Sequence, residues 1–297
     1  MPQAEQFRAL EHIAAIEALR DSRVLVMAAS TLEIELLPAL YEQCRAIGHT
    51  RRLDVVLQSR GGVVNGARRL ALLLRQFTHH LGFIVPHYCE SSATLMVLAA
   101  DEIIAGDLAI FSPIDPQLHG GTGADGGDSV VSCLDIRRFG DMGRDWFGAE
   151  SAQAQEQALS LLCGSIFPPA LTAFYRSAQE VEQIAGELLR HQLPGHDDAR
   201  RKAAVQQLMY GYHSHNYAIT GGELERMGLN VRRNEAVEEH AWRISQALHG
   251  VVGRGACETP DEPWNDALLA TRDGARVRSK RSGGLVSPWR ALGPEAA

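Results

Sequence analysis

The stretch LDVVLQSRGG, residues 53–62, decides the fold class of this chain. Its first five residues are apolar apart from Asp54, which predicts a short buried strand. The strand runs into Gly61 and Gly62, and a helix is expected from Gly66 to Phe77. A strand that turns at glycines into a helix is typical of the crossover units that build a parallel sheet.

Predicted strands and helices alternate on both sides of this stretch. The other predicted strands are Arg23 to Ala28, Phe83 to Pro86, Glu102 to Ala105 and Ala109 to Phe111. The other predicted helices are Gln6 to Leu19, Glu33 to Ile47, Ser92 to Ala100, Ala149 to Cys163, Pro169 to Arg190, Ala199 to Met209 and one that Thr220 caps and that ends near Gly228. This alternation indicates an α/β fold with a mainly parallel sheet flanked by helices.

Composition excludes several classes of protein. The formal net charge of −7 argues against nucleic acid as the main partner, because phosphate binding needs a basic surface. The five cysteines are scattered and form no CxxC pair, so neither a disulfide framework nor a zinc site is expected, and a cytoplasmic location fits best. No stretch reaches the roughly 18 apolar residues of a membrane span, and the N-terminus lacks the apolar core of a signal peptide.

The periodicity predicts one domain over residues 1–252 and a poorly ordered tail over residues 253–297. The tail loses helical and strand spacing and gains Pro, Gly, Asp and Arg. Within the domain, the glycine-rich stretch from His119 to Asp128 is expected to be a mobile loop or lid. His191 to Asp198 is a second predicted loop.

Three polar motifs and the glycine pair carry candidate chemistry. In CESSAT, residues 89–94, a serine lies between a strand and a helix, where it can be an exposed nucleophile or simply a helix cap. In SPIDPQ, residues 112–117, Asp115 is fixed between two prolines, which suits a carboxylate that orients an imidazole but is also common in turns. Gly61 and Gly62 can present bare amides to an oxyanion, or form an ordinary turn.

Two histidines, His213 and His215, alternate in the extended segment YHSHNY, residues 212–217. Alternate residues of an extended segment lie on the same side, so either side chain can supply a general base near neutral pH. The other interpretation is a pair of surface histidines. No acidic or cysteine cluster joins them at ligand spacing, so a metal site is not expected.

The motifs together, more than any one of them, resemble a known family. From about Arg23 to Val231 the chain is similar to the serine dehydrogenase proteinase family, which is related to the Clp protease proteolytic subunit and to signal peptide peptidase A. Five blocks match in order and spacing. They are LDVVL with GG (residues 53–62), VPHYCESSATL (85–95), AADEII (99–104), SPIDPQ (112–117) and HNYAIT running to MGL (215–229).

The resemblance implies a Clp-protease/crotonase-like fold of repeated ββα units, and a serine peptidase with a Ser, Asp, His triad in that chain order. Carried over residue by residue, the nucleophile is Ser91, the orienting acid is Asp115 and the base is His215. The amides of Gly62, Val63 and Ser92 would form the oxyanion hole. The family's relatives imply a homo-oligomer that acts on peptide or protein substrates, with the apolar N-terminal helix as packing surface and with no cofactor. No pattern identifies an ATPase partner.

The chain departs from the family at three places, and these leave two alternatives open. The nucleophile block usually reads Ala-x-Ser-Ala-Gly-Thr, Asn216 stands where the family has Asp, and Arg60 replaces a common Pro. These changes favour a catalytically weak or inactive Clp-like scaffold as one alternative. A crotonase-type acyl-CoA enzyme, which also uses paired amides for an oxyanion, is the other.

Overall fold

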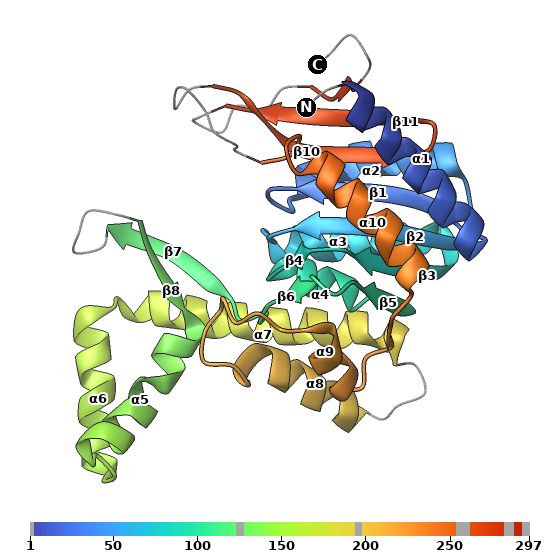
Figure 1. Ribbon diagram of the computed structural model, residues 1–297. Coiled ribbons are helices and arrows are strands. Elements are labelled where there is room, and N and C mark those ends of the chain that lie inside the picture. The colour runs from blue at the N-terminus through green and yellow to red at the C-terminus, as the bar shows by residue number, and fades with distance from the viewer. Residues whose placement is uncertain (1–2, 123–127, 194–197, 254–261, 282–287, 293–297) are drawn as a thin grey trace.

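A mainly parallel sheet organises the chain (Figure 1). The computed structural model describes residues 3–122, 128–193, 198–253, 262–281 and 288–292. The parallel strands lie in the order β1 (Arg23–Ala29), β2 (Thr50–Ser59), β3 (Thr78–Val85), β5 (Glu102–Ala105) and β9 (Val231–Arg232). Two short strands, β4 (Tyr88–Cys89) and β6 (Ile110–Phe111), extend the parallel pairing from the end of β2. The predicted α/β class with a mainly parallel sheet is confirmed.

Helices cover both faces of the sheet because its strands are apolar on both sides. On one face lie α1 (Gln3–Arg20) and α10 (Glu235–Leu248), and on the other lie η1 (Ile34–Leu36), α2 (Leu37–Ile47), α3 (Val64–Gln76) and α4 (Ser92–Val97) (Figure 1). Successive residues of a strand point to opposite faces. Val24 and Val26 of β1 accordingly pack with α1 and α10, whereas Leu25 and Met27 pack with the other layer.

The N-terminal helix is part of this core. Ile13 and Ile16 of α1 are buried against the sheet and α10 of the same chain. The expectation that this helix packs against another copy stays a prediction, because Ile13 and Ile16 are already covered whereas Leu19 of the same helix is 51% exposed.

The C-terminal region adds antiparallel strands to the sheet. β10 (Trp264–Thr271) pairs with β1, β11 (Gly274–Lys280) pairs with β10, and β12 (Arg290–Ala291) pairs with β11. The prediction that residues 253–297 form a poorly ordered tail is wrong for these strands. Their charged residues hide the pattern, since the buried Arg278 sits beside Val277 and is neutralised by acidic partners. Residues 254–261, 282–287 and 293–297 lie outside the described part of the chain.

A buried ion pair ties these strands to the rest of the core. The Arg278 guanidinium donates to Asp266 Oδ1 at 3.1 Å and also contacts Glu33, which precedes η1. The side chains of Arg278 and Asp266 are only 3% and 2% exposed. Burial of a charge is tolerated only when it is paired in this way.

Replacing Asp266 with Ala is expected to lower the free energy of unfolding by about 3 kcal/mol, because it leaves Arg278 with Glu33 as its remaining partner. Urea unfolding followed by circular dichroism measures the change. Glu239→Ala, which removes an exposed partner of Arg243 on α10, is the control and should change it by less than about 0.5 kcal/mol. Equal effects of the two substitutions would contradict the structural role of the C-terminal strands.

An arm leaves the sheet after β6 (Figure 1). It consists of the hairpin β7 (Gln117–Thr122) and β8 (Asp128–Ser132), then α5 (Cys133–Phe147) and α6 (Ala152–Ser165). The predicted mobile loop from His119 to Asp128 therefore has strands at both ends, while its centre, residues 123–127, lies outside the described residues. The sequence analysis did not predict the helix α5, which contains two glycines and buries only Cys133 and Leu134.

The chain returns along α7 (Pro168–Gln192), α8 (Asp198–Tyr210) and α9 (Gly221–Arg226), which pack below the sheet (Figure 1). The capping box of Thr220 and Glu223 at α9 is confirmed. Residues 194–197 of the predicted loop before α8 lie outside the described residues. Among the described helices none alone is long and apolar enough to cross a membrane, although α6 and α7 together meet that test across a bend of 104°.

Candidate active site

Ser91 lies on a sharp turn between β4 and α4. Its φ of 53° and ψ of −122° place a residue with a side chain in a backbone region that usually requires glycine. Such a strained strand-to-helix turn exposes a nucleophilic serine in other hydrolases. The strain is held by neighbours, since Ser91 N–H donates to Ser112 Oγ at 2.6 Å.

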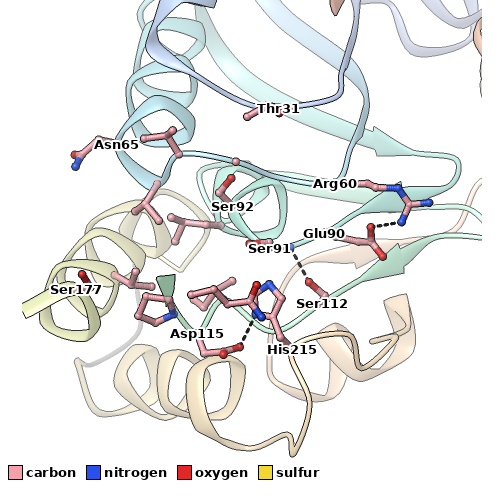
Figure 2. Close-up of a pocket in the computed structure, with 18 of the residues that line it drawn as sticks. Thr31, Arg60, Asn65, Glu90, Ser91, Ser92, Ser112, Asp115, Ser177 and His215 are labelled. Carbon is pink, nitrogen blue, oxygen red and sulfur yellow. Dashed lines mark hydrogen bonds and ion pairs between the residues drawn. The ribbon is translucent and has the colours of Figure 1, made fainter. Parts of the chain in front are cut away.

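Thr94 completes the support of this turn. Its hydroxyl donates to the carbonyl of Cys89 at 2.7 Å and accepts from the amide of Ser112 at 3.1 Å. Two hydroxyl side chains, Thr94 and Ser112, thus connect α4 to the end of β6 around Ser91, and Figure 2 shows the bond between Ser91 and Ser112. These roles were not predicted from the sequence, where Ser112 was read only as part of the Pro-flanked block.

The neighbours of Ser91 are poor nucleophile candidates. The Ser92 side chain is buried, and its hydroxyl has no hydrogen-bond partner within the described residues. Burial raises the pKa of the Cys89 thiol well above its ordinary value, so it stays protonated. Ser91 is half-buried and lines the pocket, so it is the most accessible of the three.

Asp115 and His215 meet although they are 100 residues apart. His215 Nδ1 is 2.8 Å from Asp115 Oδ1, and the carboxylate side chain is fully buried while the imidazole is 14% exposed. An antiparallel bridge between Phe111 and Ile219 draws the histidine segment alongside the end of β6. The amide of Ile114 also donates to Leu208 O at 3.1 Å, which fixes the aspartate-bearing loop against α8.

The structure distinguishes the two candidate histidines and shows which residue faces the imidazole of His215. His213 contacts Arg138 of α5, so only His215 reaches Asp115. Asn216 is exposed, and Asp115 rather than position 216, where the family has Asp, supplies the hydrogen-bond partner of His215 among the described contacts. In the part of the chain that the structure describes, no group of three or more His, Cys, Asp or Glu could hold a metal ion.

Two of the three amides predicted for the oxyanion hole are available. The amides of Gly62 and Ser92 have no acceptor among the described residues. The prediction for Val63 is wrong in this structure, because its amide donates to Leu32 O at 2.7 Å. The bridge between Leu32 and Gly62 uses that bond, and it could not be inferred from the glycine motif alone.

Both glycines of the motif are required by close backbone approach. A Cβ on Gly62, whose φ is 145°, would lie 2.6 Å from Leu32 N and O. A Cβ on Gly61 would lie 2.7 Å from Glu90 O, next to Ser91. The absence of a side chain at Gly61 therefore lets the loop after β2 lie against the serine turn.

A pocket of about 890 Å³ joins these elements (Figure 2). Ser91, Asp115 and His215 all line it, and Figure 2 shows the imidazole between the carboxylate and the serine turn. No hydrogen bond between the Ser91 hydroxyl and the imidazole is among the described contacts. Catalytic hydrogen bonds are often long in sites without substrate and shorten when it binds.

The two ends of the pocket carry different chemistry. At one end the Arg60 guanidinium pairs with Glu90 at 3.0 Å and lies over the Tyr88 ring, 4.6 Å from its centroid. At the other end Asn65 donates to Glu180 of α7 at 2.7 Å. The substitution of Arg for the family's Pro at position 60 thus places a cation at the rim, where an ion pair and a stacked ring hold it.

Comparisons with known proteins point to a family of serine proteinases. Residues 3–131 match the family described as ClpP-like SDH-type serine proteinase, which confirms the resemblance read from the sequence motifs. The matched segment contains Gly62, Ser91, Ser92 and Asp115, and it ends before His215. The match covers less than half of the chain, and over that segment the chain is similar to a ClpP-like family of serine proteinases.

Two curated relatives are uncharacterised proteins of Methanocaldococcus jannaschii. MJ0137 is 29% identical over 190 residues, which cover 64% of this chain and 57% of the relative. MJ1495 is 25% identical over 182 residues, which cover 61% of this chain and 52% of the relative. The chain therefore spans little more than half the length of either relative.

Solved structures with similar chain paths include two proteases. A mutant of the 1510-N membrane-bound stomatin-specific protease has a TM-score of 0.43 and 11% identity, covering 77% of this chain and 86% of that chain. ClpP1 from Listeria monocytogenes has a TM-score of 0.38 and 12% identity, covering 73% of this chain and 95% of that chain.

Proposed function

We propose that this protein is a serine endopeptidase that uses Ser91 as nucleophile, His215 as base and Asp115 as orienting acid. The observation that carries the proposal is the hydrogen bond between the buried Asp115 and His215 in the pocket that also contains Ser91. A carboxylate bonded to one ring nitrogen leaves the other nitrogen for the serine proton. The match to a family of serine proteinases supports the same chemistry.

In the proposed reaction His215 Nε2 accepts the proton of Ser91 as the serine oxygen attacks a peptide carbonyl. Asp115 accepts from Nδ1–H and stabilises the imidazolium that forms. The imidazolium then gives its proton to the departing amine, which leaves an acyl-enzyme on Ser91. His215 next takes a proton from a water whose oxygen attacks the acyl carbon, and the imidazolium returns that proton to the Ser91 oxygen as the bond between them breaks and the acid product leaves.

The carbonyl oxygen becomes negative in this attack, and we assign its stabilisation to the amides of Gly62 and Ser92. Both residues line the pocket that contains Ser91, and neither amide has a competing acceptor among the described residues. A donor that is fixed before the reaction starts needs no reorganisation, and one such donor is worth about 2.7–4 kcal/mol of transition-state stabilisation. Val63 is left out because its amide is already engaged.

The substrate class we propose is an extended peptide or a protein segment. Such a chain would pass through the pocket that Ser91 lines. A homo-oligomer, as in related folds, remains part of the proposal. The crotonase-type alternative needs a carboxylate as base, and the position of Asp115 against His215 supports the triad instead.

Active-site labelling tests the proposed function. A fluorophosphonate probe is expected to react with the folded protein, and mass mapping of the digested adduct should place it on Ser91. Protein denatured before labelling is the control and should not react. An adduct on another pocket serine such as Ser177, or none together with no hydrolysis of peptide pools, would contradict the proposal.

A further inference from the structure

We infer that Ser132 is a positioning residue for the proposed reaction: its hydroxyl holds Asp115 in place and links the projecting arm to the active site. Ser132 ends β8 and precedes α5, so it belongs to the arm. Its Oγ donates to Asp115 Oδ2 at 2.5 Å. The inference rests on the function proposed above.

The carboxylate of Asp115 is held at both oxygens. Oδ1 faces His215 Nδ1 at 2.8 Å, and Oδ2 accepts from Ser132. Because the side chain is fully buried, water cannot replace a lost donor without a rearrangement. Hydrogen bonds from two sides fix the plane of the carboxylate, and that plane sets the direction of the imidazole.

The Ser132 hydroxyl is itself oriented by the start of α5. Its oxygen accepts from the amide of Leu134 at 3.0 Å, while the amide of Ser132 donates to Asp135 Oδ2 at 3.0 Å. This capping box occupies an acceptor site of the hydroxyl and leaves its proton for Asp115. Burial raises the pKa of the neighbouring Cys133 thiol to about 12, so it adds no charge beside the carboxylate at neutral pH.

The helix α5 also contacts the segment that contains His215, the proposed base. Arg138 of α5 donates to the carbonyl of Tyr210 at 3.1 Å and contacts His213, two residues before His215. Arg137 lies over the Tyr210 ring, 4.1 Å from its centroid. The first turns of α5 therefore touch both the acid and the base-bearing segment, and a shift of the arm would take the donor away from Asp115.

The alternative is that Ser132 only caps α5 and has no effect on Asp115. Substitution by glycine distinguishes these two roles. Ser132→Gly removes the donor to Asp115, whereas glycine at an N-cap weakens a helix only slightly. Ser132→Thr keeps both functions of the hydroxyl. Ser151→Gly is the matched control, because Ser151 caps α6 through the Ala154 amide at 3.1 Å.

The experiment measures peptide hydrolysis by the full chain and its three variants. Ser132→Gly should lower kcat by about 10- to 100-fold with little change in KM, since a hydrogen bond to a charged group is lost. Ser132→Thr should restore most of kcat, and Ser151→Gly should match the wild type. Unchanged kcat in Ser132→Gly, or an equal loss in Ser151→Gly, would overturn the inference.

A second measurement does not depend on activity. In protein labelled with ¹⁵N-histidine, the Nδ1–H resonance of His215, assigned through its loss in His215→Ala, should broaden or shift in Ser132→Gly and stay in place in Ser151→Gly. An unchanged resonance in Ser132→Gly would refute the positioning role. If the wild type neither hydrolyses peptides nor reacts at Ser91, the proposed function fails, and this resonance still decides whether Ser132 positions the pair.

Discussion

Ser91→Ala is expected to lower kcat by about 10⁶-fold, the scale of a lost serine nucleophile in other peptidases. The substitution removes the attacking oxygen and leaves Asp115, His215 and the two free amides in place. KM should change little, because the pocket that receives the substrate keeps its lining. Steady-state hydrolysis of a peptide pool gives kcat, and fluorophosphonate labelling of the same variant should disappear with it.

Ser92→Ala is the matched control for this prediction. The Ser92 hydroxyl is buried and has no hydrogen-bond partner within the described residues, so its loss leaves no group unpaired. The Ser92 amide, which is the part proposed to act, is kept. This variant should retain kcat within about threefold and be at least as stable as the wild type. Labelling that survives in Ser91→Ala and vanishes in Ser92→Ala would reverse the assignment.

The parallel half of the fold follows from local signals in the sequence. Apolar runs such as residues 53–57 can be buried on both faces only in a sheet covered by helices, and β2 and its neighbours lie there. The antiparallel half was missed for a physical reason. In β11, Arg278 is buried by virtue of Asp266 and Glu33, which come from elsewhere in the chain, so no local pattern distinguishes it from a solvated residue.

The candidate site also contains residues that the sequence indicates and residues that only the structure reveals. The residues of the proposed triad, Ser91, Asp115 and His215, stand in motifs with family spacing, so the sequence points to them, and the structure brings Asp115 and His215 into contact. The supporting residues depend on tertiary contacts. Ser132 reaches Asp115 only because the hairpin β7–β8 folds back, and that contact has no signature in sequence.

Tertiary contacts also decide which backbone amides near the glycine motif are free to bind an oxyanion. The glycine motif indicates where bare N–H groups gather, but which of them is free depends on the loop before η1. Leu32 takes the Val63 amide at 2.7 Å and leaves that of Gly62. Sequence reasoning can therefore indicate where such amides gather, but not which of them is free of a partner.

Asp115→Asn is expected to lower kcat by about 10⁴-fold, the second largest effect among these substitutions. An asparagine amide at this position offers His215 Nδ1 either a donor or a weaker neutral acceptor. The imidazole would then favour the tautomer with its proton on Nε2, which cannot accept the proton of Ser91. The substitution keeps the volume of the side chain, so cavity formation does not contribute. Thermal unfolding of the variant checks that it is folded before its kinetics are compared.

Asn216→Asp provides the decisive comparison for the identity of the acid. In this structure the carboxylate that faces His215 comes from Asp115, while Asn216 is exposed beside it. A new carboxylate at 216 should therefore change kcat by less than about threefold, and in combination with Asp115→Asn it should not restore activity, because Nδ1 points the other way. Recovery of activity in the double variant would show that the acid belongs at 216. The hydrogen bond between Asp115 and His215 would then be structural, and the chemistry assigned to Asp115 would be wrong.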